Sequence, residues 1–318
     1  MEREPKATLL LLYIQATSLS RRLVPGKVAI RYQASLYLLL APYLLGAFIL
    51  VLLPTLLSFL LALTEYDAIS PPVWRGWQNF AAVLQDQLFL ISIRNSALFV
   101  LLTAPLRLLG ALALALLLNR PQPGVKIYRT AVYLPTVVPS VAYALIWLWI
   151  FNPIYGPLNL LLGSLGLPTP AWLVNDKTAL PALAFMALFQ LGEGFAVLLA
   201  GLQEIPQDYY RAAALDGANR WQMFRYLTLP LLAPWLLLVA MRDIIVSVQG
   251  TFTPALLMTG GGPYYATLFA PLLIYETAFD RFRFGEGAAM MLLTFLSTGL
   301  LLLTVYKLVG GWGYADEV

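Results

Sequence analysis

Long apolar segments separated by short polar connections run through most of the chain. A hydrocarbon core about 30 Å thick is crossed by a helix of about 20 apolar residues. By that criterion the sequence predicts roughly six membrane-spanning helices, at Ser35–Leu63, Ser92–Leu118, Ala131–Phe151, Leu180–Leu202, Leu231–Met258 and Gly285–Val309. The expected fold class is therefore all-α, a polytopic integral membrane protein. Kinks are expected at the prolines that fall within or at the ends of these spans, Pro54, Pro105, Pro135, Pro139 and Pro254.

Composition excludes several classes of protein. Hydrophobic residues make up 60% of the 318 residues and charged residues 11%. A soluble globular chain is about half apolar and about a quarter charged, so this chain falls outside that class. There is no cysteine and no histidine, which excludes disulfides, thiolate chemistry, imidazole metal sites and histidine-based triads. No metal site is expected.

The distribution of lysine and arginine predicts which side of the membrane each connection faces, because basic residues concentrate on the cytoplasmic side. With the N-terminus inside, thirteen basic residues fall on the cytoplasmic side, five outside and two within spans. We therefore expect a multi-pass protein of a bacterial- or archaeal-type plasma membrane with both termini in the cytoplasm. Its expected parts are a basic N-terminal segment (residues 1–34), a membrane domain (35–309, core about 92–309) and a C-terminal tail (310–318). The basic residues are dispersed, so nucleic acid is not expected as a partner.

The outer connections are rich in tryptophan, tyrosine and proline. Five tryptophans lie near the expected membrane–water interface, where amphipathic rings act as anchors: Trp74, Trp77, Trp147, Trp149 and Trp172. An interfacial belt is the simpler interpretation. The alternative is that some of these loops contact an extracytoplasmic partner.

One polar segment, Gln203–Pro230, lies between two apolar spans and is expected to face the cytoplasm. Pro206 and Asp208 suit the first turn of a helix, and Tyr209–Leu215 continues it. Gly217 is expected to end that helix. A second short helix, Arg220–Leu227, is expected to end at Pro230, so that the segment forms two short helices with a sharp bend. The alternative is a simple interfacial hairpin.

In this segment the chain resembles the membrane permease subunits of binding-protein-dependent ABC importers. The family's loop signature is matched, with its nine-residue gap, at Ala212, Ala213, Asp216, Gly217 and Ala218 and then at Leu227, Leu229 and Pro230. Tyr210 and Arg211 complete the expected contact surface for an ATPase subunit. Arg211 stands where the signature has a glutamate that helps to engage the ATPase. Either the partner carries a compensating acidic residue or coupling is altered.

Segments outside the loop resemble the carbohydrate-uptake branch of this family, the maltose-permease-like first subunit, from about residue 36 to 309. The segments are Leu63–Asp67, Arg94–Phe99, Ala115–Arg120, Tyr128–Leu162, Met258–Pro263 and Ile274–Ala289. The resemblance implies a six-helix subunit with the type I importer permease fold. It also implies four kinds of partner: a second permease, two ATPase subunits that carry ATP and Mg, an extracytoplasmic solute-binding protein and the lipid bilayer. No cofactor is expected on this chain, which has no Walker A motif.

The resemblance also places a sugar path in the middle of the fourth and fifth core helices. The corresponding residues are Met186, Phe189, Gln190 and Glu193, and Ser247, Val248, Gln249 and Thr251. On a continuous helix Gln190 and Glu193 would share one face. For the polar residues the alternative is a helix–helix hydrogen bond.

Away from their ends, the predicted spans contain four charged residues: Arg107, Glu193, Arg242 and Asp243. A carboxylate there is costly unless it faces a cavity or a partner, so Glu193 is a functional candidate. Arg107 is expected to pair with Asp243 or Glu193. Arg242 and Asp243 are adjacent and are expected to point to different faces. With only Arg107 and Arg242 available as cations, a neutral sugar is favoured over an anionic solute.

Other functions remain open from the residues alone. The same machinery could import a polyol, glycerol phosphate or an amino-acid-like solute. A secondary transporter would need its own coupling site and usually shows internal repeats, which are not evident. A membrane enzyme would have to use acidic pairs or a serine–lysine pair, because cysteine and histidine are absent.

Overall fold

The computed structural model describes residues 26–120 and 122–309, which divide into two units at Leu60. The first unit is an apolar helical rod: α2 (Gly26–Ala47), a π-helical turn η1 (Phe48–Leu52) and α3 (Leu53–Ala62). Between residues 37 and 61 every side chain is at least partly exposed. An apolar helix with no packed face needs lipid or another apolar surface around it. The helix begins nine residues before the predicted start, so the predicted basic segment 1–34 overlaps it. Residues 1–25 and the predicted tail 310–318 lie outside the described residues.

The second unit is helical apart from one short hairpin. Its elements are β1 (Thr64–Glu65), β2 (Val73–Trp74), α4 (Gln78–Gln85), α5 (Gln87–Leu118), α6 (Val125–Val137), α7 (Ser140–Ile150), α8 (Pro157–Ser164), α9 (Asp176–Ala187), α10 (Gly192–Glu204), α11 (Gln207–Leu215), α12 (Arg220–Met223), η2 (Phe224–Thr228), α13 (Leu229–Gln249), α14 (Phe252–Pro254), η3 (Ala255–Thr259), α15 (Ala270–Tyr275), η4 (Glu276–Asp280) and α16 (Phe284–Val309). The hairpin is a local departure from the expected all-α fold.

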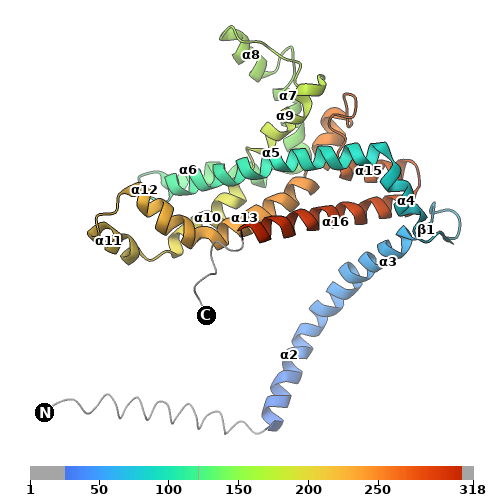
Figure 1. Ribbon diagram of the computed structural model, residues 1–318, viewed down its shortest axis with the longest axis horizontal. Helices are drawn as coiled ribbons and strands as arrows, with labels where there is room; N and C mark the ends of the chain where they lie inside the picture. The colour runs from blue at the N-terminus through green and yellow to red at the C-terminus, as the bar shows by residue number, and fades with distance from the viewer. Residues whose placement is uncertain (1–25, 121, 310–318) are drawn as a thin grey trace. The chain divides into compact units, whose positions relative to one another are not determined.

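Helix α5 is the centre of this unit. It packs against α9, α10, α13 and α15, while α13 also packs against α16 (Figure 1). A helix that is apolar on all sides is suited to such a surrounded position. Arg129 caps the last turn of α5 by donating from Nη2 to the Leu118 carbonyl at 2.8 Å. The buried side chains form two large clusters, one around Phe99, Trp147 and Phe269 and another around Leu112, Phe195 and Leu232.

Four helices are long and apolar enough to cross a membrane, and two bent helix pairs bring the candidates to six, counted over the described residues. The predicted third span, Ala131–Phe151, is not one helix. α6 and α7 meet at an angle of 100° at Val138 and Pro139. Proline lacks an amide donor and forces the preceding residue out of the helical region, and Val138 is extended with ψ 127°. Trp147, predicted in the interfacial belt, is buried in the core instead.

The predicted fourth span is also broken. α9 and α10 are inclined by 44° across residues 188–191. Gln190 lies in this break and Glu193 in the first turn of α10, so the predicted shared helical face is wrong. Gly192 allows the close approach of α10 to α6, because a Cβ there would lie 2.8 Å from the Tyr133 Cα. The bounds of the predicted last span, Gly285–Val309, agree with those of α16 to within one residue.

The hairpin is tied to the neighbouring helices by backbone contacts. Asn79 donates from Nδ2 to the carbonyls of Ala62 and Thr64, at 2.9 and 2.8 Å. The Phe284 amide donates to the Tyr66 carbonyl at 3.0 Å. Gly285 lies so close to β1 that a Cβ there would be 1.9 Å from the Thr64 oxygen. The start of α16 is thereby fixed against the hairpin.

This close approach predicts a selective sensitivity to a single methyl group. Gly285→Ala should lower the free energy of unfolding by about 1–3 kcal/mol, because the backbone of β1 must move to admit the methyl group. Thermal unfolding of the detergent-solubilised protein measures the effect. Gly299→Ala on the same helix is the matched control, since its Cβ would meet no atom within 4 Å. Equal behaviour of the two variants would contradict this account of the hairpin.

The hydrogen bonds of Asp67 predict that the stability of the hairpin depends on pH. Its carboxylate accepts hydrogen bonds from the amides of Ser70 and Ile69, at 2.7 and 3.0 Å, and these bonds lower the pKa of Asp67 below 3.8. The resulting stabilisation is present above the unfolded pKa of the carboxyl and is lost as the pH falls through the lowered folded value. The wild-type protein should therefore melt above Asp67→Asn at pH 7, and the difference should shrink below about pH 4. A difference that persists in acid would show that the charge is not responsible.

Candidate functional site

The polar segment forms an ordered bend rather than a loose loop. α11 begins after Pro206, with Asp208 in its first turn, as the sequence predicts. Gly217 has φ +81°, and the amides of Gly217 and Ala218 donate to the carbonyls of Ala214 and Ala213, at 3.1 and 2.9 Å. This is the Schellman pattern of a helix end, and it requires a left-handed residue that glycine supplies without strain. The predicted helix end at Gly217 is confirmed.

The second half of the segment differs from the prediction. Asn219 and Gln222 form a capping box at the start of α12, with reciprocal bonds of 2.9 and 2.8 Å. The helix does not end at Pro230. It continues through the π-helical turn η2 into α13, so that Arg220–Thr259 is one candidate span of 40 residues. A wider π turn accommodates the missing proline amide without ending the helix.

The predicted contact residues of the segment divide into two groups. Tyr210 and Leu229 pack against the hydrophobic cluster around Leu112, Phe195 and Leu232. The Tyr210 hydroxyl lies 3.0 Å from Thr228 Oγ1. The others point outward or line a shallow groove of about 330 Å³, formed by Ala213, Asp216, Gly217, Ala218, Gln222, Met223, Tyr226 and Leu227. Ala212 and Pro230 are exposed. Arg211 is 77% exposed and pairs with Asp208 at 3.0 Å.

A partly open cavity of about 100 Å³ lies between α5, α7, α9 and α13, with the exposed residues Ser140 and Gly250 in its lining. Of the predicted path residues, four line it: Met186, Gln190, Ser247 and Thr251. The remaining four do not. Phe189 packs on Trp147 with ring centroids 5.0 Å apart, Val248 joins a small cluster with Ile244, Gln249 is exposed and Glu193 is engaged elsewhere.

The hydroxyl groups of the cavity are held by helix contacts. Thr103 Oγ1 donates to Ser247 Oγ at 3.2 Å, and Thr251 Oγ1 donates to the Val248 carbonyl at 2.8 Å. Sequence reasoning missed Tyr143, which is buried and donates from its hydroxyl to the Met186 carbonyl at 2.8 Å. A tyrosine within an apolar segment is itself a signal, because its hydroxyl requires a partner when buried.

The four intramembrane charges form one network beside the cavity. Arg107 Nη2 lies 3.5 Å from Asp243 Oδ1 and donates to the Gln190 carbonyl at 2.9 Å. The predicted pairing of Arg107 is therefore confirmed with Asp243. Arg242 contacts Glu193 and also donates from Nη1 to Asp243 Oδ1 at 2.8 Å. Arg242 and Asp243 pair although adjacent residues of a helix point to different faces, because the long arginine side chain reaches back to its neighbour.

The network has consequences for the charge of the cavity. Asp243 is 2% exposed and Arg107 5%, and such buried charges persist only when they are paired. Two cations balance two anions. Among the described residues, Arg107 Nε and Thr277 Oγ1 are the buried side-chain atoms without a hydrogen-bond partner. Across the same residues there is no cluster of three or more histidine, cysteine or acidic side chains that could hold a metal ion.

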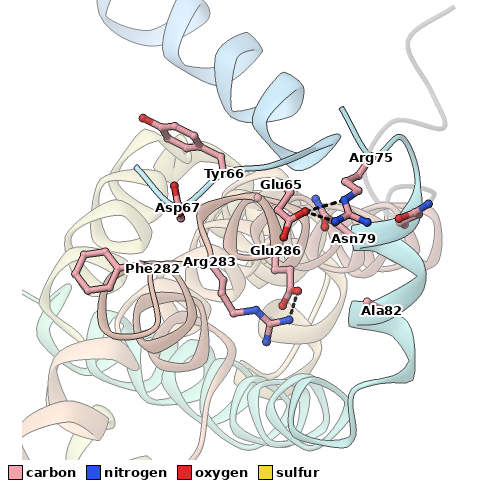
Figure 2. A pocket seen from close by; sticks show the side chains of 11 residues that line it. Glu65, Tyr66, Asp67, Arg75, Asn79, Ala82, Phe282, Arg283 and Glu286 are labelled. Atoms are coloured by element: carbon pink, nitrogen blue, oxygen red, sulfur yellow. Dashed lines mark hydrogen bonds and ion pairs between the residues drawn. The ribbon is translucent and has the colours of Figure 1, made fainter. Parts of the chain in front are cut away.

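A second open pocket of about 330 Å³, here called the hairpin pocket, lies between the hairpin, α4 and the start of α16. Two ion pairs line it, Glu65 with Arg75 and Glu286 with Arg283 (Figure 2). Glu65 and Arg75 have exposed side-chain fractions of 62% and 47%. An accessible pocket with alternating charges is suited to a polar protein surface rather than to an apolar ligand.

Comparison with known proteins gives consistent matches. Residues 107–311 match the family described as "Binding-protein-dependent transport system inner membrane component". The chain is 35% identical over 286 residues to the probable ABC transporter permease protein YesP of Bacillus subtilis (strain 168), covering 88% of this chain and 92% of that protein. It is 32% identical over 276 residues to the trehalose/maltose transport system permease protein MalF of Thermococcus litoralis, covering 86% and 92%.

A solved structure supports the same conclusion for the fold. The crystal structure of a bacterial ABC transporter involved in the import of the acidic polysaccharide alginate contains a chain that superposes with a TM-score of 0.75 at 22% identity, covering 88% of this chain and 96% of that chain. The fold is thus that of an ABC importer permease, as the sequence predicts. Permeases of this family are transport subunits that lack a cofactor. The chain belongs to the family of binding-protein-dependent inner membrane transport components and is a permease, not an enzyme.

Proposed function

We propose that this chain pairs with a second, homologous permease and that the pair imports a sugar, driven by two ATPase subunits that bind ATP and Mg. A solute-binding protein delivers the sugar on the outer side. The observation that carries this proposal is the ordered, exposed bend at Gly217, joined without interruption to the helix that lines the cavity. A rigid bend at the end of a long helix is suited to transmit a displacement, imposed by a partner subunit, to the other end of that helix.

In this proposal the displacement is transmitted along a single helix. The groove at Gly217 is the proposed contact with an ATPase subunit. The bond between Tyr210 and Thr228 joins α11 to the start of α13, and α13 extends to Ser247 at the cavity. Displacement of the bend therefore moves one wall of the cavity relative to α5. This chain contributes the rearrangement of helix packing, and the free energy comes from ATP hydrolysis on the partners.

The two ends of the second unit fit the proposed topology. Figure 1 shows α11 and α12 at one end of α5 and α4 at the other. The excess of basic residues supports a cytoplasmic position for α11 and α12 and an outer position for the hairpin pocket. We assign the hairpin pocket to the docking of the solute-binding protein, because its paired charges can exchange partners with a polar surface. Because Arg211 is exposed and positively charged, we expect an acidic residue opposite it on the ATPase.

The cavity favours an uncharged, hydroxyl-rich solute. Apart from Arg107, its polar groups are amide and hydroxyl groups set among aromatic rings, as sugar binding requires, and the charge of Arg107 is balanced by Asp243. The second candidate is an anionic solute, such as an acidic saccharide or glycerol phosphate. It would need cations from the second permease, because both Arg107 and Arg242 are already paired.

The bend predicts a sharp difference between two substitutions of one residue. Gly217→Val should abolish ATP-dependent uptake while membrane insertion persists, because a β-branched side chain does not tolerate φ +81°. Gly217→Asn should retain most uptake, since asparagine adopts left-handed conformations readily. Uptake into proteoliposomes by the reconstituted complex measures both. Normal uptake by the valine variant would refute the coupling role.

The cavity predicts a defect in affinity. Gln190→Ala should raise the apparent KM for import about five- to tenfold, the loss of a hydrogen bond worth about 1 kcal/mol, and should leave kcat within about twofold. The solute for the assay is the cargo that co-purifies with the cognate binding protein. Gln122→Ala, in an exposed turn away from the cavity, is the control. An unchanged KM would remove Gln190 from the path.

A further inference from the structure

The break between α9 and α10 interrupts the regular helical bonding, and two side chains donate to backbone carbonyls there. The Met186 carbonyl also accepts from the Phe189 amide at 3.2 Å, whereas the donor to the Gln190 carbonyl is a side chain. Tyr143 donates to the carbonyl of Met186, in the last turn of α9. Arg107 Nη2 donates to the carbonyl of Gln190, within the break. Unpaired carbonyls in apolar surroundings are costly, so these two bonds support the broken backbone directly.

Arg107 is itself held in place by Asp243. The two side chains come from α5 and α13, and both are almost completely buried. A buried guanidinium is stable only beside a carboxylate, and Arg242 supplies a further donor to the same Asp243 oxygen. The break is thus connected to both helices that pack on either side of the cavity.

Arg107 lines the cavity together with Gln190. Its Nη2 donates to the Gln190 carbonyl and lies 3.5 Å from Asp243 Oδ1, and its Nε is buried. The bonds of Arg107 are therefore to the backbone of the break and to Asp243. Gly194 brings the start of α10 close to α13, since a Cβ there would lie 3.1 Å from Val239 Cγ1. The tight packing leaves the break little freedom while Arg107 is present.

We infer that Arg107 is a positioning residue of the transport path. With Asp243 it holds the break at residues 188–191, so that the amide of Gln190 faces the cavity and sets the affinity for the transported solute. This role rests on the proposed function, because it assumes that the cavity belongs to the path. The clamp on the backbone is a property of the chain and can be tested apart from transport.

The test uses a double variant that leaves no buried charge from the pair. Either single substitution would strand a buried charge and could prevent folding. Arg107→Met/Asp243→Leu removes both charges while keeping apolar bulk, and Arg242 retains Glu193. The chain has no cysteine, so Leu188→Cys carries a unique nitroxide label in the break. A second label at Leu300→Cys on exposed α16 reports general loosening.

In the assembled complex without solute, the label at residue 188 should become mobile in the double variant, with a rotational correlation time at least twofold shorter. The label at residue 300 should not change. Thr103→Val is the matched control, because it removes another α5–α13 hydrogen bond without touching Gln190. Unchanged mobility at residue 188, or equal loosening at both labels, would overturn the inference and leave the pair a merely structural one.

A kinetic measurement separates this inference from the proposed function. ATP hydrolysis by the reconstituted complex is stimulated with the cognate binding protein purified with its native cargo. The double variant should raise the apparent KM for the loaded binding protein at least fivefold with kcat within about twofold, and Gln122→Ala, in an exposed turn, should change neither. Wild-type KM in the double variant would overturn the inference. If the wild-type complex shows no stimulation, the proposed function fails, whereas the label in the break still tests the clamp.

Discussion

A helix within an apolar environment can be interrupted only if its freed backbone groups find other partners, and this constraint organises the core of the permease. At the break between α9 and α10, Arg107 from α5 donates to the Gln190 carbonyl, and Tyr143 from α7 adds a second donor to the Met186 carbonyl. Arg107 in turn requires Asp243 on α13. One interruption of the backbone therefore determines the chemistry of three neighbouring helices, and the cavity lies among them.

The exposed bend at Gly217 obeys the opposite requirement. Its polar groups can be satisfied by water, so its shape has to be determined locally. The left-handed Gly217 and the capping box of Asn219 and Gln222 provide this determination within a few residues. Because α12 continues through η2 into α13, the bend is a rigid extension of a core helix rather than an appended domain. Local hydrogen bonds thus give the bend a defined shape, and the continuous helix connects the bend directly to the helical core.

The sequence predicted the elements whose causes are local. The apolar length of α16, the start of α11 at Pro206 and the helix end at Gly217 all depend on residues within one or two turns. The break at residues 188–191 could not be predicted from Gln190 and its neighbours, because it is supported by side chains distant in sequence. The capping box was legible in Asn219 and Gln222, and Tyr143 could have been recognised as a buried hydroxyl in need of a partner.

The position of the break explains why a charged clamp is useful there. α9 contributes Leu183 and Met186 to one hydrophobic cluster, whereas α10 contributes Phe195 and Leu198 to the other. Close-packed clusters resist continuous deformation, so a change in the angle between α9 and α10 is least costly at the boundary between them. At that boundary directional bonds add to the packing contacts and fix the orientation of the backbone. Arg107 supplies such bonds to both the backbone and Asp243, and the two cations of the network balance its two anions.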